Sequence, residues 1–304
     1  MKSIIETILR KEGFVQIGFL NEKDAQFTDW ISSWLKAGYH GDMSWMKKHH
    51  HLRQNPCEIE PNGKSIISLA YPYFTISPIE WSNRNPISNY GWGADYHSVL
   101  KKILKKAMIA IHASIPDFEG RCFVDSAPLP EKIIAAQCGL GWIGKNSMLI
   151  HRNHGSYLFL AEIVTNLDLE STPPAKDYCG TCTKCIDACP TQAILENRTI
   201  DTRKCISFLT IEKRGEFNEI ENKSIEYQIF GCDICQQVCP WNRSLTPVKN
   251  SPFKCFDKLK RLSIYEWSNL NVQQFEELKI KSPIKRAKLE GIKRNAQAII
   301  DNQK

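Results

Sequence analysis

One short run of cysteines constrains this chain more than any other feature of its sequence. The stretch CGTCTKCIDACP holds cysteines at the spacing C-x2-C-x2-C-x3-C-P, namely Cys179, Cys182, Cys185 and Cys189. This is the bacterial ferredoxin run, in which three closely spaced thiolates wrap one 4Fe–4S cluster and the fourth serves another cluster. The run therefore predicts a second group of cysteines elsewhere in the chain.

The second group is found in CDICQQVCP, which contains Cys232, Cys235 and Cys239 and ends in a proline. This run lacks the cysteine that should open it, and Cys205 in RKCISFL is the obvious replacement. In two-cluster ferredoxins the last cysteine of each run ligates the other cluster. We therefore predict one cluster on Cys179, Cys182, Cys185 and Cys239, and the other on Cys189, Cys205, Cys232 and Cys235.

Zinc is the competing interpretation of these cysteines. Structural zinc sites use paired arms of two cysteines, and each arm gives half of a tetrahedron. Two runs that each end in Cys-Pro, with eight fitting ligands, favour iron–sulfur clusters instead. We interpret the remaining cysteines as small buried hydrophobic side chains: Cys57, Cys122, Cys138 and Cys255.

The N-terminus does not resemble a secretory signal, and no apolar run approaches the roughly 20 residues that span a membrane. We therefore expect a cytoplasmic protein with no membrane partner, in which cysteines are metal ligands or redox groups rather than disulfides. The positive charge lies near the C-terminus. Residues 241–304 carry 14 Lys and Arg against 6 Asp and Glu, a net of +8, whereas the preceding residues carry a net of −1. This asymmetry favours an anionic partner, above all nucleic acid, with a solubilising surface as the alternative.

Hydrophobic periodicity predicts helices over 2–11, 22–37 and 97–115, and strands over 14–20, 64–74 and 156–167. This order indicates an α+β or α/β domain. The Pro-rich stretch ESTPPAKDY marks a boundary. We therefore divide the chain into a first domain (1–170), a cysteine-rich domain (171–243) and a basic helical C-terminal segment (244–304).

Asp125 is the candidate for acid chemistry, within RCFVDSAPLPEK. Asp, Ser and Pro form turns, and Asp125 could instead cap the helix that starts near Pro130. The chemical interpretation needs a carboxyl group that stays protonated, which apolar neighbours favour. The glycine-rich GLGWIGKN follows a helix rather than a strand, so it is not a dinucleotide fingerprint. Such glycines suit either a loop or the close approach of a large flat ligand.

The motifs together resemble one known family, the epoxyqueuosine reductases. The resemblance rests on FVDSAPLPEK, GLGWIGKNSMLI, CGTCTKCIDACPTQAI, RKCISFLTIE, YQIFGCDICQQVCPWN and SPIKRAKLEGIKRNA, which span nearly the whole chain. It implies a nitroreductase-like, cobalamin-binding α+β domain followed by a bacterial ferredoxin-like domain with two 4Fe–4S clusters. It further implies a monomeric enzyme that reduces epoxyqueuosine to queuosine at the wobble position of tRNA, the last step of queuosine biosynthesis.

The resemblance also implies roles for particular residues. Asp125 matches the family's proton donor, and the eight cysteines match its cluster ligands. Cobalamin contacts fall at His97, Asp125, Lys145, Asn146, His151, Ser207 and Asp233. The tRNA contact after LTIE falls at Lys213 and Arg214, and the basic C-terminal segment adds Lys285, Arg286, Lys293 and Arg294. A low-potential electron donor is implied as a further partner.

Two other functions remain open from the sequence. A cobalamin-dependent reductive dehalogenase would share the cofactor domain and both clusters, but such enzymes typically carry a twin-arginine export signal, and a basic C-terminal segment has no purpose with a small halogenated substrate. A ferredoxin-type electron-transfer module would leave about 170 residues before the clusters unexplained, because a two-cluster ferredoxin needs only the motif pair.

Overall fold

The computed structural model describes residues 1–27, 29–75, 85–249 and 251–303, and these pack into two compact units. The first unit comprises residues 1–35, 45–72 and 96–182. The second comprises 36–44, 73–95 and 183–304, with the gaps given above. The mixed α+β class is confirmed. The predicted boundaries at residues 170 and 243 stay a prediction. The two units are not continuous in sequence, because residues 36–44 and 73–95 belong to the second unit.

A four-stranded antiparallel sheet forms the first unit. Its strands are β1 (Gln16–Asn21), β2 (Ser65–Pro72), β6 (Leu158–Thr165) and β3 (Gly120–Phe123), in that spatial order. The two central strands read as nearly continuous apolar runs, because a strand covered on both faces buries every side chain. The strands expected over 14–20, 64–74 and 156–167 are thus confirmed.

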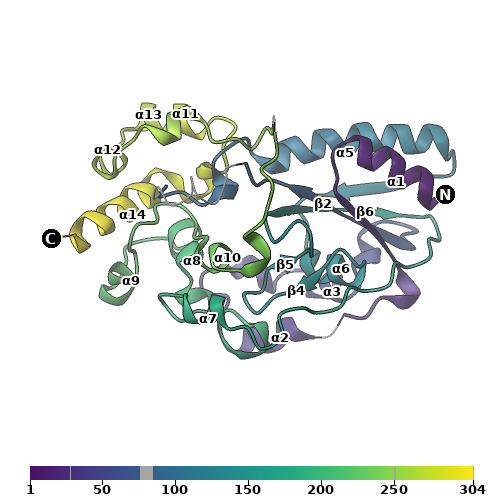
Figure 1. Cartoon of the computed structure of the whole chain (residues 1–304), viewed down its shortest axis with the longest axis horizontal. Coiled ribbons are helices and arrows are strands. Elements are labelled where there is room, and N and C mark those ends of the chain that lie inside the picture. The colour runs from purple at the N-terminus through teal and green to yellow at the C-terminus, as the bar shows by residue number, and fades with distance from the viewer. Residues whose placement is uncertain (28, 76–84, 250, 304) are drawn as a thin grey trace. The chain divides into compact units, whose positions relative to one another are not determined.

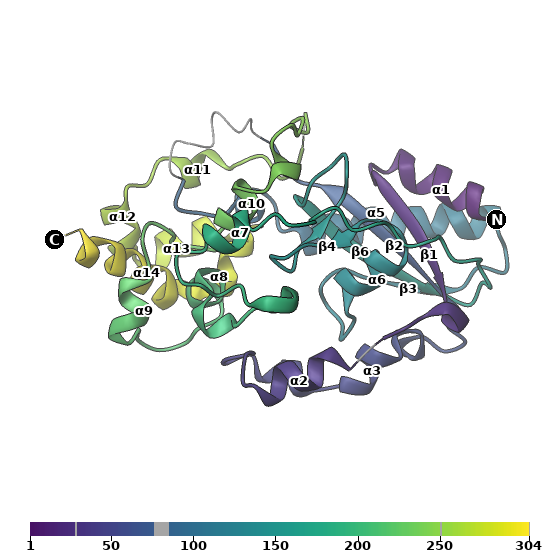
Figure 2. The same ribbon diagram turned by 60° about the horizontal axis from the view of Figure 1, so that its bottom comes forward.

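Helices cover both faces of this sheet. On one side α1 (Lys2–Lys11) packs against α5 (Tyr96–Ser114), and on the other side lies α6 (Glu131–Gln137) (Figures 1 and 2). The apolar stripe of α5 buries Leu100, Leu104 and Ile111, as its periodicity predicts. The helix expected over 22–37 is wrong in its extent. A 3-10 turn covers Glu22–Asp24, the described part of α2 is Trp30–Lys36, and residue 28 lies outside the described residues.

The glycine-rich stretch forms a small hairpin of β4 (Trp142–Ile143) and β5 (Leu149–Ile150). Two of its glycines are required because other backbone segments of the protein pack closely against them. A Cβ on Gly141 would lie 2.2 Å from the carbonyl oxygen of Ile150, and Gly139 has a φ of +76°. Only glycine allows such close backbone approach and such a φ without strain. A further short helix, α3 (His50–Gln54), lies between β1 and β2 in the chain.

The second unit is built from short helices around one apolar core. Trp267, Phe230 and Ile284 are wholly buried at its centre. The long α14 (Lys288–Asn302) packs against α8, α9 and α12. The two short helices that lie within the cysteine runs, α7 (Lys184–Asp187) and α10 (Ile234–Gln237), pack against one another. The remaining helices are α8 (Ile206–Ile211), α9 (Glu219–Lys223), α11 (Asp257–Lys260), α12 (Ile264–Ser268) and α13 (Val272–Lys279). In the described part of the chain, no helix combines the length and apolarity needed to cross a membrane.

Candidate active site

Asp125 lies just after β3, in a backbone conformation that few side chains adopt. Its φ is 45°, in the left-handed region, so surrounding contacts must hold it there. One carboxylate oxygen, Oδ2, accepts a hydrogen bond from the Tyr96 hydroxyl at 2.7 Å. The side chain is nevertheless 65% exposed. Asp125 is therefore fixed in direction while its carboxyl group remains accessible.

The alternative that Asp125 caps α6 is wrong. The helix begins at Glu131, after Pro130, and no side chain caps it. Asp125 contacts the helix in another way, because its backbone N–H donates to Oε1 of Glu131, a residue of the first helical turn, at 2.6 Å. The first turn of the helix thus holds the loop that carries Asp125.

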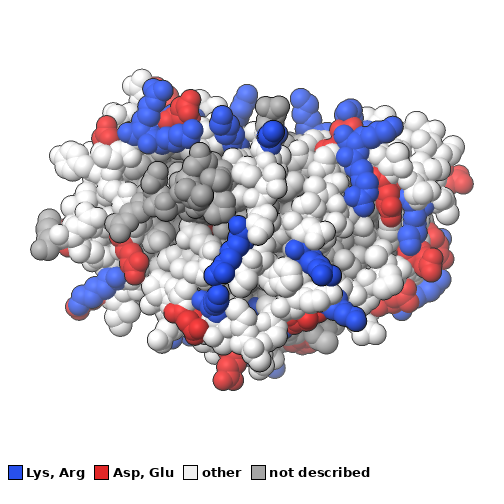
Figure 3. All heavy atoms as spheres, in the orientation of Figure 1, with Lys and Arg blue, Asp and Glu red and all other residues white. Residues whose placement is uncertain are grey.

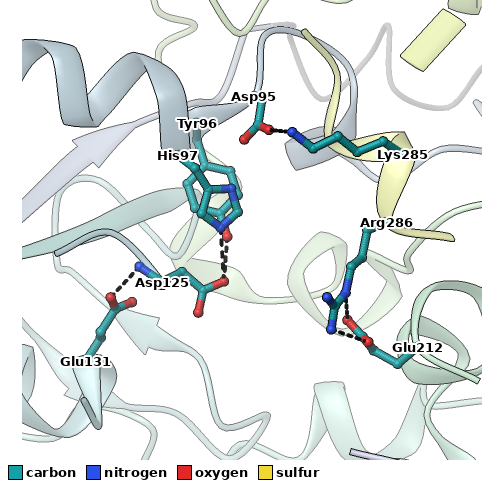
Figure 4. Close-up of polar contacts among 8 residues, drawn as sticks. All are labelled: Asp95, Tyr96, His97, Asp125, Glu131, Glu212, Lys285 and Arg286. Atoms are coloured by element: carbon teal, nitrogen blue, oxygen red, sulfur yellow. Dashed lines mark hydrogen bonds and ion pairs between the residues drawn. The ribbon is translucent and has the colours of Figure 1, made fainter. Parts of the chain in front are cut away.

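Tyr96, which opens α5, is held by aromatic stacking. Its ring centre lies 4.3 Å from that of Phe159 on β6, with only 6° between the planes, and 4.0 Å from that of His97. Nε2 of His97 lies 3.7 Å from Oδ2 of Asp125. Figure 4 shows Tyr96 and His97 both directed at the Asp125 carboxylate. A hydroxyl and an imidazole therefore converge on one exposed carboxyl group.

Two further carboxyl groups lie behind this loop. Glu162, in the middle of β6, is wholly buried and accepts a hydrogen bond from Oγ of Ser68 at 3.4 Å. The charge of the nearby Glu131 carboxyl group also acts on it. Burial raises the pKa of Glu131 to about 8, and the charge of Asp125 adds to this rise. Burial and repulsion from Glu131 raise the pKa of Glu162 well above its ordinary value.

Three of the residues predicted to contact a cofactor lie on or beside the β4–β5 hairpin. Lys145 and the buried Asn146 are in its turn. Just after β5, Nδ1 of His151 accepts hydrogen bonds from the backbone N–H groups of Asn153 and His154, both at 3.1 Å. Burial lowers the pKa of His151 to about 4, and repulsion from His154 contributes. The ring of His151 is therefore neutral, with its proton on Nε2.

Two other predicted contacts, Ser207 and Asp233, lie in the second unit. Ser207 is partly exposed in the first turn of α8. Asp233 is buried, and its Oδ2 accepts the backbone N–H of Asn89 at 2.6 Å. Burial raises the pKa of Asp233 to about 7, although that hydrogen bond opposes the shift. Asn89 is wholly buried, and its side-chain amide has no hydrogen-bond partner among the described residues. A ligand with polar groups would satisfy this amide.

The second unit brings together the cysteines predicted for one cluster. After burial, the charges of Cys205 and Cys189 raise the pKa of Cys232. Those of Cys232 and Cys205 do the same for Cys235. The charge of Cys185, which is assigned to the other cluster, also acts on Cys235. Thiolates are the ligands of iron–sulfur clusters, so the donor set fits such a group.

The other predicted ligands are Cys179 and Cys182 at the end of the first unit, and Cys185 and Cys239 in the second. The indole Nε1 of Trp142 donates to Sγ of Cys179 at 3.4 Å, which is a contact that stabilises a thiolate. Among the residues described, no three His, Cys, Asp or Glu side chains are grouped so as to hold a single metal ion. Of the four remaining cysteines, Cys57, Cys138 and Cys255 are buried as predicted, and Cys122 is partly exposed.

The basic residues predicted to contact RNA come from two stretches that meet in the second unit. Nη2 of Arg214 donates to the backbone carbonyl of Arg286 at 3.0 Å, across 72 residues of sequence. Arg286 also forms a bidentate pair with Glu212, with both distances at 2.8 Å (Figure 4). The pairing continues with Lys285 on Asp95 and Lys213 on Glu221.

Arg294 is an internal brace of this region rather than a surface cation. Its guanidinium donates to the carbonyl oxygens of Leu209, Lys213 and Gly215, and stacks 3.9 Å from the ring centre of Phe217. Its donors are thus engaged inside the unit, whereas the neighbouring Lys293 is exposed. On the face drawn in Figure 3, Lys and Arg side chains are interspersed with Asp and Glu rather than gathered in one uniform patch.

Sequence reasoning missed the roles of Tyr96, Glu131 and Glu162. A signal for Glu162 was present, since a lone acid inside the apolar strand LFLAEIVT must be buried. Glu131 and Tyr96 carried no such signal, because their partners lie on other elements and are brought close only by the fold.

Comparison with known proteins identifies the family of this chain. Residues 53–126 match the family model "Epoxyqueuosine reductase QueG, DUF1730", and residues 178–242 match "4Fe-4S double cluster binding domain". An epoxyqueuosine reductase of Leadbetterella byssophila is 45% identical over 266 residues, which cover 87% of this chain and 86% of the relative.

Solved structures give the same result. An epoxyqueuosine reductase crystallised with an epoxyqueuosine-modified tRNA-Tyr stem loop matches with a TM-score of 0.86 at 26% identity, over 99% of this chain and 80% of that one. The Bacillus subtilis enzyme, solved with its catalytic aspartate loop swung out of the active site, matches with a TM-score of 0.86 at 25% identity, over 99% and 81%. The chain therefore belongs to the epoxyqueuosine reductase family.

Proposed function

We propose that this protein reduces epoxyqueuosine to queuosine at the wobble position of tRNA, with Asp125 as the proton donor. The observation that carries the proposal is the exposed Asp125 carboxyl group, held by the Tyr96 hydroxyl on one side and by Glu131 on the other. Asp125 stands in the VDSAP motif through which the sequence resembles the family, and the Bacillus subtilis relative has a catalytic loop named for its aspartate.

The chemistry requires electrons and protons in equal number. Converting the epoxide into an alkene breaks both carbon–oxygen bonds, takes up two electrons and two protons, and releases the oxygen as water. An alkoxide is a poor leaving group, so an acid that protonates the departing oxygen lowers the barrier, typically by a factor of about 10² to 10⁴. Asp125 supplies that proton, and Tyr96 and His97, both at its Oδ2, are placed to replace it.

The cofactors belong to the same proposal. Two 4Fe–4S clusters are assigned by the crossed motif rule to Cys179, Cys182, Cys185 and Cys239, and to Cys189, Cys205, Cys232 and Cys235. Cobalamin, when bound, supplies a strongly reducing cobalt centre for the epoxide. His97, Lys145, Asn146, His151, Ser207 and Asp233 are assigned to hold it. The unpartnered amide of Asn89 beside Asp233 supports a polar ligand there.

The tRNA would be bound largely through its phosphates. Lys213, Arg214, Lys285, Arg286 and Lys293 lie in the second unit and supply positive charge. Phosphate contacts of this kind are independent of sequence and weaken with salt. The modified base would be recognised when it is splayed out of the anticodon loop. We assign the reaction to a cytoplasmic monomer supplied by a low-potential electron donor.

An anaerobic turnover assay tests the proposal. The protein, reconstituted with iron and sulfide, is given a chemical reductant and tRNA that contains epoxyqueuosine, with and without added cobalamin. We expect queuosine to appear in the digested tRNA only when cobalamin is present. Absence of queuosine under both conditions, with the clusters intact, would contradict the proposed activity. Turnover without cobalamin would contradict the cofactor assignment alone.

A further inference from the structure

We propose that Glu131 and Glu162 form a carboxyl pair that shares a proton, and that this pair positions the loop carrying Asp125. Glu131 is then a positioning residue for the proton donor, and it touches neither substrate nor cofactor. The inference rests on the proposed function only for the effect on turnover. The pair itself is a property of the folded first unit, so it can be tested without substrate.

The geometry begins with the strained backbone of Asp125. A left-handed φ of 45° is costly for a non-glycine residue, by about 1 kcal/mol or more, and persists only where neighbours enforce it. The hydrogen bond from the Asp125 N–H to Glu131 Oε1, at 2.6 Å, is the backbone contact that does so. Glu131 lies in the first turn of α6, which is anchored in the apolar core by Ile134 and Ala135. The loop is therefore tied to a rigid element.

Glu162 is the carboxyl group that interacts with Glu131. Glu162 is wholly buried in the middle of β6, where Ser68 of β2 lies directly opposite it. Oε1 of Glu162 accepts the Ser68 hydroxyl, but Oε2 receives no N–H or O–H donor from the described residues. A carboxylate oxygen left in this state is unfavourable, because burial removes its hydration. A proton shared with Glu131 removes the deficit and joins the two side chains.

Electrostatics leads to the same arrangement. Two ionised carboxylates in contact in an apolar core would repel strongly, so at least one proton stays on the pair at neutral pH. The groups that face the pair are Asp125 on the loop, His97 on α5 and the Cys138 thiol at the end of α6. The carboxylate of Asp125 opposes ionisation of Glu131, and His97 favours it. Burial dominates, and it raises the pKa of Glu131 to about 8.

Three variants separate this role from a merely structural one. Glu131→Gln keeps an oxygen for the Asp125 N–H and gains an amide that can donate to Glu162, so it mimics the protonated pair. Glu131→Ala removes the support of the loop. Glu119→Gln, at an exposed glutamate of the same unit, is the matched control.

Hydrogen exchange of the metal-reconstituted protein, without tRNA, is the first measurement. We expect the amide of Asp125 to exchange at least tenfold faster in Glu131→Ala than in the wild type, and at the wild-type rate in Glu131→Gln and Glu119→Gln. Unchanged exchange in Glu131→Ala would overturn the inference. If that variant does not fold, the pH dependence of the Glu131→Gln variant decides the matter.

The sign of that dependence follows from the raised pKa of Glu131. Between its ordinary value of 4.5 and about 8, the folded chain holds a proton that the unfolded chain has lost. Its contribution to stability is therefore complete below pH 4.5 and is lost as the pH rises through 8. We expect the Tm of the wild type and of Glu119→Gln to fall over this range more steeply than that of Glu131→Gln. Equal slopes in all three proteins would overturn the shared proton.

Turnover provides the link to function. We expect kcat to fall by about 10- to 100-fold in Glu131→Ala with KM nearly unchanged, because a misplaced donor affects the chemical step. We expect Glu131→Gln to restore it to within about threefold of the wild type at neutral pH. Equal losses in both variants would contradict positioning by the pair. Absence of turnover in the wild type would instead contradict the proposed function, and would leave the exchange and Tm results to decide on the pair.

Discussion

At the scale of single residues, the acid chemistry proposed for this protein depends on one exposed carboxyl group with fixed surroundings. Asp125 combines an accessible side chain with a strained backbone, and the Tyr96 hydroxyl fixes the direction of its carboxyl group. Strain at a loop residue that is also held by side chains of other elements is typical of an active site. A surface aspartate in an ordinary turn would need none of these contacts.

Replacing Asp125 by asparagine tests its role as the acid. The amide oxygen can still accept the Tyr96 hydroxyl, so we expect the fold and both clusters to persist. Turnover should fall by about 10² to 10⁴, because an amide cannot deliver a proton. The assay is conversion of epoxyqueuosine in tRNA, and Asp117→Asn, at an exposed aspartate of the same unit, is the control. Near-normal turnover would assign the proton to another group.

His151 should make the first unit sensitive to acid. Burial lowers its pKa from 6.5 to about 4, so between these values the unfolded chain binds a proton that the folded chain excludes. The stability that His151 contributes is thus present above pH 6.5 and is lost as the pH falls through 4. We expect His151→Asn to show a smaller fall in Tm over this range, since the Asn oxygen can still accept the backbone N–H groups. The exposed His112→Asn should behave as the wild type.

At the scale of elements, the positions of glycine and arginine show which segments are held tightly. The β4–β5 hairpin tolerates no side chain at Gly141, since the chain of β5 lies against it. The loop after α8 is closed by Arg294, which binds the carbonyl groups of Lys213 and Gly215 in the loop and that of Leu209 in α8. Both segments carry residues assigned to ligands, so each is a rigid support for a site.

Two glycine substitutions should have opposite effects on stability. In Gly141→Ala the added Cβ would lie 2.2 Å from the carbonyl oxygen of Ile150, so the hairpin must distort and we expect a fall in Tm. In Gly291→Ala the new Cβ lies 3.8 Å from that of Ala287, an ordinary contact within α14. Alanine favours a helix over glycine by about 0.8–1 kcal/mol, so we expect Tm to rise. A rise for Gly141→Ala would show that the hairpin is not tightly packed.

At the scale of the whole molecule, the proposed function needs both an electron-carrying region and a surface for a large anionic substrate. The double-cluster match covers residues 178–242. Of the basic residues assigned to tRNA, Lys213 and Arg214 lie within this region, and the others follow it in sequence. Several of these cations are already paired with acids, as Arg286 is with Glu212. Their attraction for phosphate is therefore reduced, and the exposed lysines should matter more than the total charge implies.

The cluster assignment predicts the iron content of variants. The protein reconstituted under anaerobic conditions should hold about eight irons per chain. Cys205→Ser should lose close to half of them, because one cluster would lack a ligand. Cys255→Ala should keep all of them, since Cys255 is buried away from both runs in sequence. Full iron content in Cys205→Ser would remove Cys205 from the ligand set.

The salt dependence of tRNA binding tests the basic surface. Each phosphate contact contributes about 0.7–0.9 to the slope of log affinity against log salt. Replacing the exposed Lys293 by glutamine should therefore reduce the slope by about 0.8 with little change in Tm, whereas replacing Lys213, which is paired with Glu221, should reduce it less. Lys102→Gln on α5 serves as the control for the loss of a charge. Arg294→Gln should lower Tm instead, because it removes the brace of the loop. An unchanged slope would assign these lysines to solubility alone.

The sequence by itself determined the class of fold, the ligand spacing and the family. Ferredoxin spacing is local where Cys179, Cys182 and Cys185 follow one another in a single short run, and apolar runs reveal the strands of a sheet covered on both faces. The capping role considered for Asp125 was also a prediction from local sequence, and it was wrong. In the structure, Glu131 at the start of α6 accepts the backbone N–H of Asp125 instead.

Only the tertiary structure decided which side chains act on Asp125. Tyr96, Glu131 and Glu162 come from α5, α6 and β6, and antiparallel pairing of β3 with β6 brings them together. The pKa of a carboxyl group depends on what surrounds it, and Glu131 looks like any solvent-facing acid of a first helical turn until β6 is placed behind it. Burial and long-range contact are properties of the fold, so the shared proton could be found only there.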